Sequence, residues 1–214
     1  AVRHPDAITR PDESVAVGDM GPATVWDRAL EGVDVVIHLA ARTHVMRETT
    51  ADPLAEYRSV NVIATQGLAR AAITAGVRRF MFASSIKVNG EHTAENPFSE
   101  LDAPRPEDAY GVSKWEAEQA LRTTAAGASM ETVVLRLPLL YGPGVKGNFL
   151  SLLRAIDRGW PLPFAAIHNR RSLLYVGNLV EAIILGIDHP AAANNTYLLA
   201  DDDGALQDAG RQHA

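Results

Sequence analysis

The run Val33-Asp34-Val35-Val36-Ile37-His38-Leu39-Ala40 is β-branched or apolar at nearly every position. A strand exposed to water on one face alternates apolar and polar residues, whereas this run is apolar on both faces. Continuous runs of this kind are typical of parallel strands that are covered by helices on each side. The sequence therefore predicts a parallel strand inside an α/β domain.

Similar strand-like runs and helical patterns alternate on both sides of this stretch. Apolar residues near 3.6 spacing predict a helix over 53–75, which Gly76 ends as a C-cap. The other predicted elements are strands over 14–17, 77–85 and 131–137, and helices over 23–30 and 107–126. Strands that alternate with helices at this spacing predict a doubly wound parallel sheet.

The pattern changes after Tyr141-Gly142-Pro143-Gly144. Beyond it, the sequence predicts helices over 148–158 and 177–187 and short strands over 173–176 and 196–199. We therefore expect a dinucleotide-binding domain over residues 1–145, a small partial substrate lobe over 146–200, interleaved with the first domain, and an irregular tail over 201–214.

Composition excludes several classes of function. The chain has 214 residues, a formal net charge of −6 and no cysteine. The acidic balance argues against nucleic acid or an anionic membrane as the main partner, and the absence of cysteine excludes disulfides and thiolate chemistry. The seven histidines show no spacing suited to a metal, and no apolar run is long enough to span a bilayer. We expect a cytoplasmic protein without a metal site.

Tyr110 and Lys114 are the most informative pair, in Asp108-Ala109-Tyr110-Gly111-Val112-Ser113-Lys114. Positions i and i+4 of a helix share one face, so the phenol and the ammonium project the same way. A nearby cation favours the phenolate and suits a tyrosine that exchanges a proton with an alcohol or sugar hydroxyl. Upstream, a predicted strand ends in Ser84-Ser85, and the carboxyl ends of such strands are where ligands bind.

These segments together resemble the NAD-dependent epimerase/dehydratase family of extended short-chain dehydrogenases/reductases. The resemblance covers about residues 15–199 and rests on several motifs in register: Gly18-Asp19, Val36-Ile37-His38-Leu39-Ala40-Ala41, Asn61-Val62-Ile63-Ala64-Thr65, Phe82-Ala83-Ser84-Ser85, Tyr110-x-x-x-Lys114, Tyr141-Gly142-Pro143-Gly144 and Arg171. It implies a Rossmann-type fold, a bound nicotinamide cofactor and a catalytic set of Ser85, Tyr110 and Lys114.

The resemblance also implies binding residues. Those that it assigns to the cofactor are Asp19, Met20, Leu39, Ala40, Ala41, Asn61, Lys114 and Pro138. Those that it assigns to a nucleotide-diphosphate sugar are Ser85, Asn148, Phe164 and Arg171. The last three have plain alternatives: a helix N-cap for Asn148, a core position for Phe164 and a surface charge for Arg171. Lys87 either contacts the sugar or a phosphate or lies on a solvated loop.

Two departures from the family pattern stand out. The glycine-rich phosphate loop and the first strand are absent, so we expect a sequence that lacks roughly 30–40 residues of such an enzyme, or a truncated product. Leu139 stands where galactose 4-epimerases carry a substrate-binding Asn. The chain is more similar to epimerases or 4-reductases of bacterial surface-polysaccharide pathways. The resemblance favours NAD, while Arg3 leaves NADP open.

The leading hypothesis is a nucleotide-sugar epimerase or dehydrogenase that works by hydride transfer at a sugar carbon, C4 being the favoured one. The alternatives are a 4-ketoreductase or dehydratase of the same family, and an inactive or non-catalytic dinucleotide-binding relative. The family pattern also implies a homodimer that forms through the helices predicted at 53–75 and 107–126.

Overall fold

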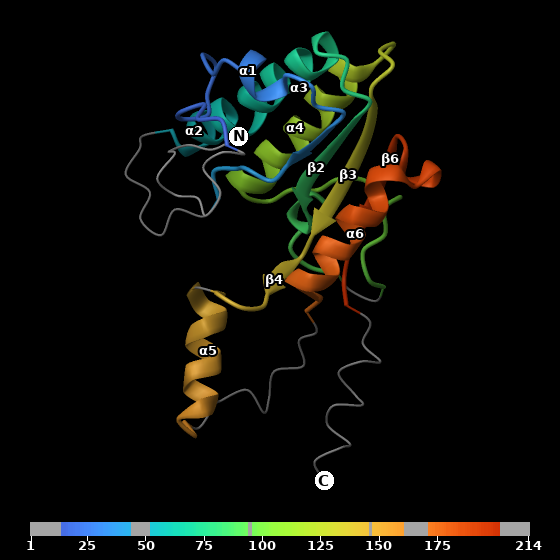
Figure 1. Cartoon of the computed structure of the whole chain (residues 1–214). Coiled ribbons are helices and arrows are strands. Elements are labelled where there is room, and N and C mark those ends of the chain that lie inside the picture. Colours follow the sequence, from blue (N-terminus) through green and yellow to red (C-terminus); the bar gives the residue numbers. More distant parts are fainter. Residues whose placement is uncertain (1–13, 44–51, 94–95, 146, 161–170, 202–214) are drawn as a thin grey trace. The chain divides into compact units, whose positions relative to one another are not determined.

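The computed structural model describes residues 14–43, 52–93, 96–145, 147–160 and 171–201 (Figure 1). The chain divides into two compact units. The first comprises Ala1–Arg136 with Gly186–Leu198, and the second comprises Leu137–Leu185 with Leu199–Ala214. The predicted domain boundaries remain predictions.

The first unit is built on a four-stranded sheet. Its strands lie in the order β1 (Val35–His38), β2 (Arg79–Ser85), β3 (Glu131–Leu137) and β6 (Asn195–Leu198). β1 runs parallel to β2, and β3 runs parallel to β6. The first three strands follow chain order, and β6 joins β3 after two intervening strands that form a separate sheet. This order matches one half of a doubly wound sheet. The predicted α/β fold with a parallel sheet is confirmed.

Helices α3 (Ala64–Thr74) and α4 (Ala109–Ala125) pack on one face of this sheet (Figure 1). Leu68 and Leu121 from the two helices meet Phe80, Phe82 and Val134 from the strands, all almost fully buried. The same core includes Trp26 and Leu30, which belong to the segment around the short helix α1 (Asp27–Leu30). Burial of large apolar side chains of this kind is the main stabilising contribution to the fold.

The helix predicted over 53–75 consists of three consecutive pieces. It begins as α2 (Pro53–Tyr57), continues as the π-helical turn η3 (Arg58–Ile63) and ends as α3. Asp52 caps its first turn by accepting from the Ala55 backbone amide at 3.0 Å. A π-helical turn inserts one extra residue and is frequent at functional sites. Apolar spacing near 3.6 cannot reveal such an insertion, so the sequence did not predict it.

The amino-terminal elements are shorter than predicted. Ala16 forms only a single β-bridge where a strand over 14–17 was predicted, and the helix predicted over 23–30 is reduced to α1. Ile37 in β1 remains 40% exposed, so one face of that strand is only partly covered. The reason is its position, because β1 lies at the edge of the sheet that the described residues form.

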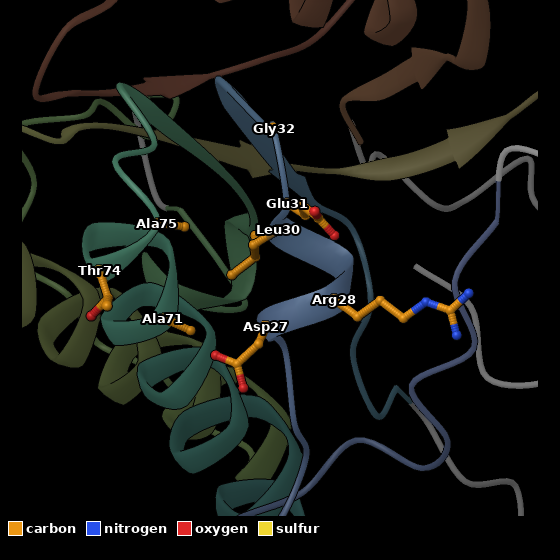
Figure 2. Close-up of a pocket in the computed structure, with 8 residues that line it drawn as sticks. All are labelled: Asp27, Arg28, Leu30, Glu31, Gly32, Ala71, Thr74 and Ala75. Atoms are coloured by element: carbon orange, nitrogen blue, oxygen red, sulfur yellow. The ribbon is translucent and has the colours of Figure 1, made fainter.

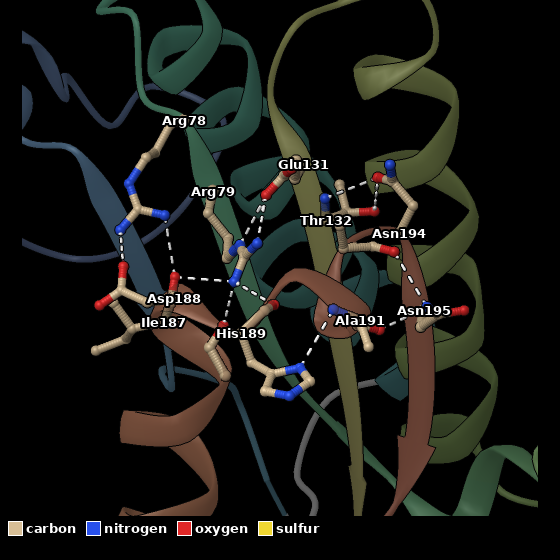
Figure 3. Close-up of polar contacts among 12 residues, drawn as sticks. Arg78, Arg79, Glu131, Thr132, Ile187, Asp188, His189, Ala191, Asn194 and Asn195 are labelled. Carbon is tan, nitrogen blue, oxygen red and sulfur yellow. Dashed lines mark hydrogen bonds and ion pairs between the residues drawn. The ribbon is translucent and has the colours of Figure 1, made fainter.

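Arg79 fixes the amino end of β2 to the end of helix α6 (Val176–Asp188) (Figure 3). The Arg79 guanidinium is buried, pairs with Glu131 at 2.6 Å and donates to the backbone carbonyls of Gly186, Ile187 and His189. The carbonyls at a helix C-terminus lack partners within the helix, and a cation there satisfies them. A 3₁₀ turn, η5 (Pro190–Ala192), then leads to β6.

The second unit contains a two-stranded parallel sheet of β4 (Leu139–Tyr141) and β5 (Leu173–Tyr175), helix α5 (Gly147–Asp157) and most of α6. Asp201 accepts from the Tyr175 amide at 3.0 Å and from Asn178 at 2.7 Å. β4 was not predicted from the sequence, whereas β5 was. No helix in the described ranges combines the length and the apolar character that crossing a membrane requires.

Candidate functional site

The Ser85 and Tyr110 side chains meet at the carboxyl end of β2. Helix α4 begins after Asp108, whose carboxylate accepts from the Gly111 amide at 2.6 Å, and Tyr110 lies in its first turn. The Tyr110 hydroxyl is hydrogen-bonded to the Ser85 side chain. Burial raises the pKa of Tyr110, and the bond from Ser85 acts in the opposite direction because it stabilises the phenolate.

Lys114 lies one turn further along α4 and is only 1% exposed. Its ammonium lies 4.0 Å from the centre of the Phe82 ring, a cation–π contact with the middle of β2. Burial lowers the pKa of Lys114 to about 7, against the opposing effect of the Glu118 carboxylate. An amine with such a pKa gains or loses its charge near neutral pH, so its local charge is sensitive to small changes nearby.

His38 is a buried neighbour that the sequence did not single out. Its Nε2 lies 2.9 Å from the Thr65 hydroxyl, and its ring stacks on Phe82 with the ring centres 5.6 Å apart. Burial, helped by the charge of Lys114, lowers the pKa of His38 to about 3. The imidazole is therefore neutral at ordinary pH and does not compete with Lys114 as a cation. The one feature of the sequence that could have pointed to His38 is its position in an otherwise apolar strand.

Asn61 projects from the π-helical turn and connects two parts of the candidate site. Its amide oxygen accepts from the Arg42 amide at 2.8 Å, and its nitrogen donates to the Arg42 carbonyl at 3.0 Å. The same nitrogen donates to the Ser113 hydroxyl at 3.0 Å, and Ser113 donates to the Tyr110 carbonyl. Asn61 thus links the loop after β1 to the first turns of α4.

Lys87 is held by acidic side chains rather than lying on a solvated loop. It follows Ser85 in the 3₁₀ turn η4 (Ile86–Val88) and pairs with Glu91 and Asp108, each at 2.6 Å. Burial disfavours its charge, but the bonds to Asp108 and Glu91 prevail and raise its pKa. Because Asp108 also caps α4, the Lys87 pair joins the Ser85 turn to the helix of Tyr110. A contact with substrate remains a prediction.

The residues predicted to contact the cofactor are distributed over several elements. Leu39 is 60% exposed just beyond β1, and the small residues Ala40 and Ala41 lie between it and the Arg42 backbone that Asn61 holds. A strand end with exposed small and apolar residues fits a dinucleotide, because the backbone of the chain can approach it closely. Asp19 is exposed, and Met20 packs against the core beside it.

The remaining predicted residues lie outside the first unit. Pro138, Asn148 and Arg171 belong to the second unit. Asn148 lies inside α5, which begins at Gly147, and Arg171 is exposed just before β5. Phe164 lies outside the described residues. Among the described residues, no group of three metal-ligating side chains is placed to hold a metal ion.

A surface pocket between α1 and α3 lies away from this site (Figure 2). Asp27 and Leu30 line it from α1, and Ala71 and Thr74 line it from the last turn of α3. Since α3 ends there and leads into the amino end of β2, the pocket is at the opposite end of the sheet from Ser85. Arg28 extends away from α3 in Figure 2, and no candidate residue lines the pocket.

Comparisons with known proteins identify the family of this chain. The model of the NAD dependent epimerase/dehydratase family matches residues 3–200. A UDP-glucose 4-epimerase of Vibrio cholerae is 49% identical over 204 residues, which are 94% of this chain and 62% of that protein. An N-acetyl-alpha-D-glucosaminyl-diphospho-ditrans,octacis-undecaprenol 4-epimerase of Escherichia coli O157:H7 is 32% identical and matches 88% of this chain and 56% of its own length.

Among solved structures, MoeE5 in complex with UDP-glucose and NAD superposes with a TM-score of 0.73 at 31% identity, over 87% of this chain and 62% of MoeE5. The chain thus spans less than two thirds of the length of these relatives. The match to the family model nevertheless covers nearly all of the chain, including every described residue of the Ser85, Tyr110 and Lys114 region. The chain belongs to the NAD dependent epimerase/dehydratase family.

Proposed function

We propose that this chain carries the catalytic side chains of an NAD-dependent nucleotide-sugar 4-epimerase. The observation that supports this most directly is the hydrogen bond between Ser85 and Tyr110, with buried Lys114 one helical turn away. A tyrosine, a hydroxyl at a strand end and a lysine on the tyrosine's helix face form a set that can exchange a proton with a sugar hydroxyl.

Each of the three side chains has a distinct role. Tyr110 removes the proton from the C4 hydroxyl of the sugar and later returns it, so that no proton is gained or lost overall. Ser85 donates to the same sugar oxygen. Lys114, when protonated, stabilises the Tyr110 phenolate, since a cation near a phenol favours its ionised form. NAD, when bound, would supply the hydride chemistry that inverts the sugar at C4.

Each residue predicted to bind the cofactor has a proposed contact. Leu39, Ala40 and Ala41 would lie along the ribose and phosphates, and Asn61 would keep the following loop in place. Asp19 and Met20 are the candidates for the adenine end. Lys114 would also bind the nicotinamide ribose, and Pro138 would lie beside the nicotinamide ring.

The substrate we propose is a UDP-sugar, because the relatives include a UDP-glucose 4-epimerase and MoeE5 was solved with UDP-glucose. Arg171 would bind the diphosphate through its guanidinium fork, and Asn148 would hydrogen-bond it. Phe164 would stack on the uracil base. Lys87 would reach the sugar or a phosphate only by exchanging one of its present carboxylate partners.

The test is turnover of UDP-glucose and UDP-N-acetylglucosamine by the complete protein, with each 4-epimer detected chromatographically. The Tyr110→Phe variant should lose at least about a hundredfold in kcat, the usual contribution of acid–base catalysis. Tyr197→Phe is the matched control, because the Tyr197 hydroxyl on β6 donates to the Ala191 carbonyl in η5. Full activity of Tyr110→Phe would contradict the mechanism.

The same assay separates the other reactions of this family. Net formation of NADH with substrate would indicate a dehydrogenase, and loss of water from the sugar would indicate a dehydratase. Consumption of a 4-keto sugar with added NADH or NADPH would indicate a reductase. A thermal-shift titration with NAD and NADP shows which cofactor binds, and a shift with neither would support a non-catalytic relative.

We also propose a homodimer that forms through η3, α3 and α4. Arg58 and Glu116 connect η3 and α4 through two hydrogen bonds, at 2.7 and 2.5 Å, so the two helices present one combined surface. Ile63 on this surface is 46% exposed. Sedimentation analysis should show a dimer that Ile63→Glu converts to a monomer, and a wild-type monomer would contradict the proposal.

A further inference from the structure

An ion pair between Glu118 and Arg136 is buried next to Ser84, the residue before Ser85 in β2. Glu118 is 0% exposed and Arg136 3% exposed. The Arg136 Nε donates to Glu118 Oε1 at 3.0 Å, and its Nη2 donates to Oε2 at 2.8 Å, the parallel two-bond geometry that suits a guanidinium and a carboxylate. Neither residue was singled out from the sequence.

Further hydrogen bonds extend this pair to neighbouring segments. The Ser84 hydroxyl donates to Glu118 Oε1 at 2.5 Å, and Arg136 Nη1 donates to the Asn89 side-chain oxygen at 2.9 Å. Asn89 in turn donates to the Ser99 carbonyl at 2.9 Å. The ion pair therefore bonds directly to the end of β2 and to the residue after η4, and its own members come from α4 and β3.

These attached segments carry the proposed catalytic residues. Ser84 immediately precedes Ser85, and Asn89 closes the turn that contains Lys87. Glu118 lies one helical turn after Lys114, on the same buried face of α4. A buried ion pair is a poor source of stability, because removing two charges from water costs about as much as their attraction returns. The hydrogen bonds of the pair to these segments point to a role other than stability.

We propose that Glu118 and Arg136 are positioning residues, which hold Ser85 against Tyr110 and set the balance of charge beside Lys114. This inference rests on the proposed function only for its effect on turnover. Its structural part, the placement of Ser85, Tyr110 and Lys114, stands on the contacts above.

The charges around Lys114 give the proposal a distinctive signature. The titratable groups that interact with Lys114 are Glu118 on α4 and neutral His38 on β1, and Arg136 on β3 forms an ion pair with Glu118. Glu118 raises the pKa of Lys114. Glu118→Gln should therefore lower that pKa further, whereas Arg136→Met leaves the carboxylate unbalanced and should raise it. Opposite shifts would show that the pair controls the charge beside Lys114, and turnover tests whether it also positions the catalytic residues.

The experiment is a pH titration of the lysine side chains by NMR in protein labelled with ¹⁵N-lysine. The chain has three lysines, so the Lys114 signal can be assigned by its loss in Lys114→Met. We expect shifts of opposite sign for Glu118→Gln and Arg136→Met, and a value near that of the wild type for the double variant. Shifts of the same sign, or none in either variant, would overturn the proposal.

Turnover provides the second measurement. In the complete protein, both single variants should lower kcat by about tenfold or more while KM changes little, because an interaction needed at the reacting atoms is weakened. The double variant should regain thermal stability, since an unpartnered buried charge is removed, but should keep a lowered kcat. Wild-type kcat in a folded double variant would show that the pair is only structural.

Glu131→Gln is the matched control, because it removes a carboxylate from buried Arg79 at the other end of β2 (Figure 3). It should alter stability without moving the Lys114 titration. If the wild type proves to have no epimerase activity, the proposed function fails, but the NMR titration still decides whether the pair controls Lys114. If a single variant does not fold, the double variant alone tests the proposal by its kcat.

Discussion

Asn61 donates a hydrogen bond to the Ser113 hydroxyl at 3.0 Å, which joins the π-helical turn to the helix that carries Tyr110 and Lys114. The extra residue of the turn directs a buried amide at two partners at once, Ser113 and the Arg42 backbone. An α-helix with the 3.6 periodicity of its neighbours would rotate Asn61 relative to these partners. The π-helical turn is therefore part of the site rather than an irregularity of the fold.

Replacement of Asn61 by Ala should destabilise the protein strongly. The substitution removes the partner of the Arg42 amide and carbonyl, and each buried polar group left unsatisfied costs about 1–3 kcal/mol. We expect a loss of about 2–4 kcal/mol in the free energy of unfolding measured with urea. Asn195→Ala is the control, because Asn195 bonds two carbonyls on the surface. Equal losses for the two variants would contradict the role of Asn61.

Lys114→Met should stabilise the protein most at and below neutral pH. The folded pKa of Lys114 is about 7 and the unfolded value is 10.5, so between these values the unfolded state binds more protons. Stability of the wild type therefore rises with pH across this window, by up to about 1.4 kcal/mol per pH unit from this group. Below pH 7 Lys114 carries its charge in both states, so the full free-energy cost of burying this ammonium lowers the stability of the wild type.

The measurement is urea unfolding of wild type and Lys114→Met from pH 6 to 10. The advantage of the variant should shrink as the pH rises. Lys87→Met should instead destabilise the protein by a nearly constant amount from pH 6 to 10, because the raised pKa of Lys87 means that its charge stabilises the folded state at every pH below 10.5. An advantage of Lys114→Met that does not depend on pH would show that the ammonium is not desolvated as described.

His38 should make the protein sensitive to acid. Its pKa is about 3 when folded and 6.5 when unfolded, so the unfolded state binds the additional proton between these values. Stability should therefore fall as the pH drops below 6.5 and this contribution should level off near pH 3. In His38→Gln, which can keep a bond to Thr65, the decline between pH 6.5 and 4 should be smaller. An unchanged decline would assign acid sensitivity to other groups.

Ser85→Ala should raise the pKa of Tyr110 beyond its already raised value. The bond from Ser85 favours the phenolate, and burial opposes it. The pKa is measured from the ultraviolet absorbance of tyrosinate, as the difference between each protein and its Tyr110→Phe counterpart. Thr74→Ala is the control, because the exposed Thr74 hydroxyl donates to the Arg70 carbonyl and takes no part in the Ser85–Tyr110 contact. A Tyr110 pKa that is the same in Ser85→Ala and wild type would contradict the Ser85–Tyr110 contact.

The sequence predicted the elements that depend on local pattern. The run around Val36 gave a parallel strand, and the Tyr110 and Lys114 spacing placed both residues on one helix. Features that depend on partners distant in the chain were missed. Neither the pairing of Lys87 with Asp108 nor that of Glu118 with Arg136 has a signature in spacing, because these contacts span 21 and 18 positions and form only when the sheet assembles.

Gly111 should tolerate no larger side chain, which tests how closely α4 approaches the Ser85 turn. A Cβ at this position would lie 2.9 Å from the Lys87 carbonyl oxygen and 3.1 Å from the Asp108 carboxylate. The carbonyl is backbone and cannot move without shifting the turn, so overpacking should outweigh the gain in helix propensity. We expect Gly111→Ala to lose about 1–3 kcal/mol in the free energy of unfolding.

Gly67→Ala in α3 is the matched control for that substitution. A Cβ at Gly67 would meet only the Trp26 ring nitrogen, at an ordinary contact distance of 3.9 Å. Since alanine favours a helix over glycine by about 1 kcal/mol, Gly67→Ala should be neutral or stabilising. The two variants make the same chemical change in helices of the same unit. Opposite signs of their changes in the free energy of unfolding would therefore reflect the close contact at Gly111. If Gly111→Ala stabilised as much as Gly67→Ala, the turn after Ser85 would have to lie further from α4.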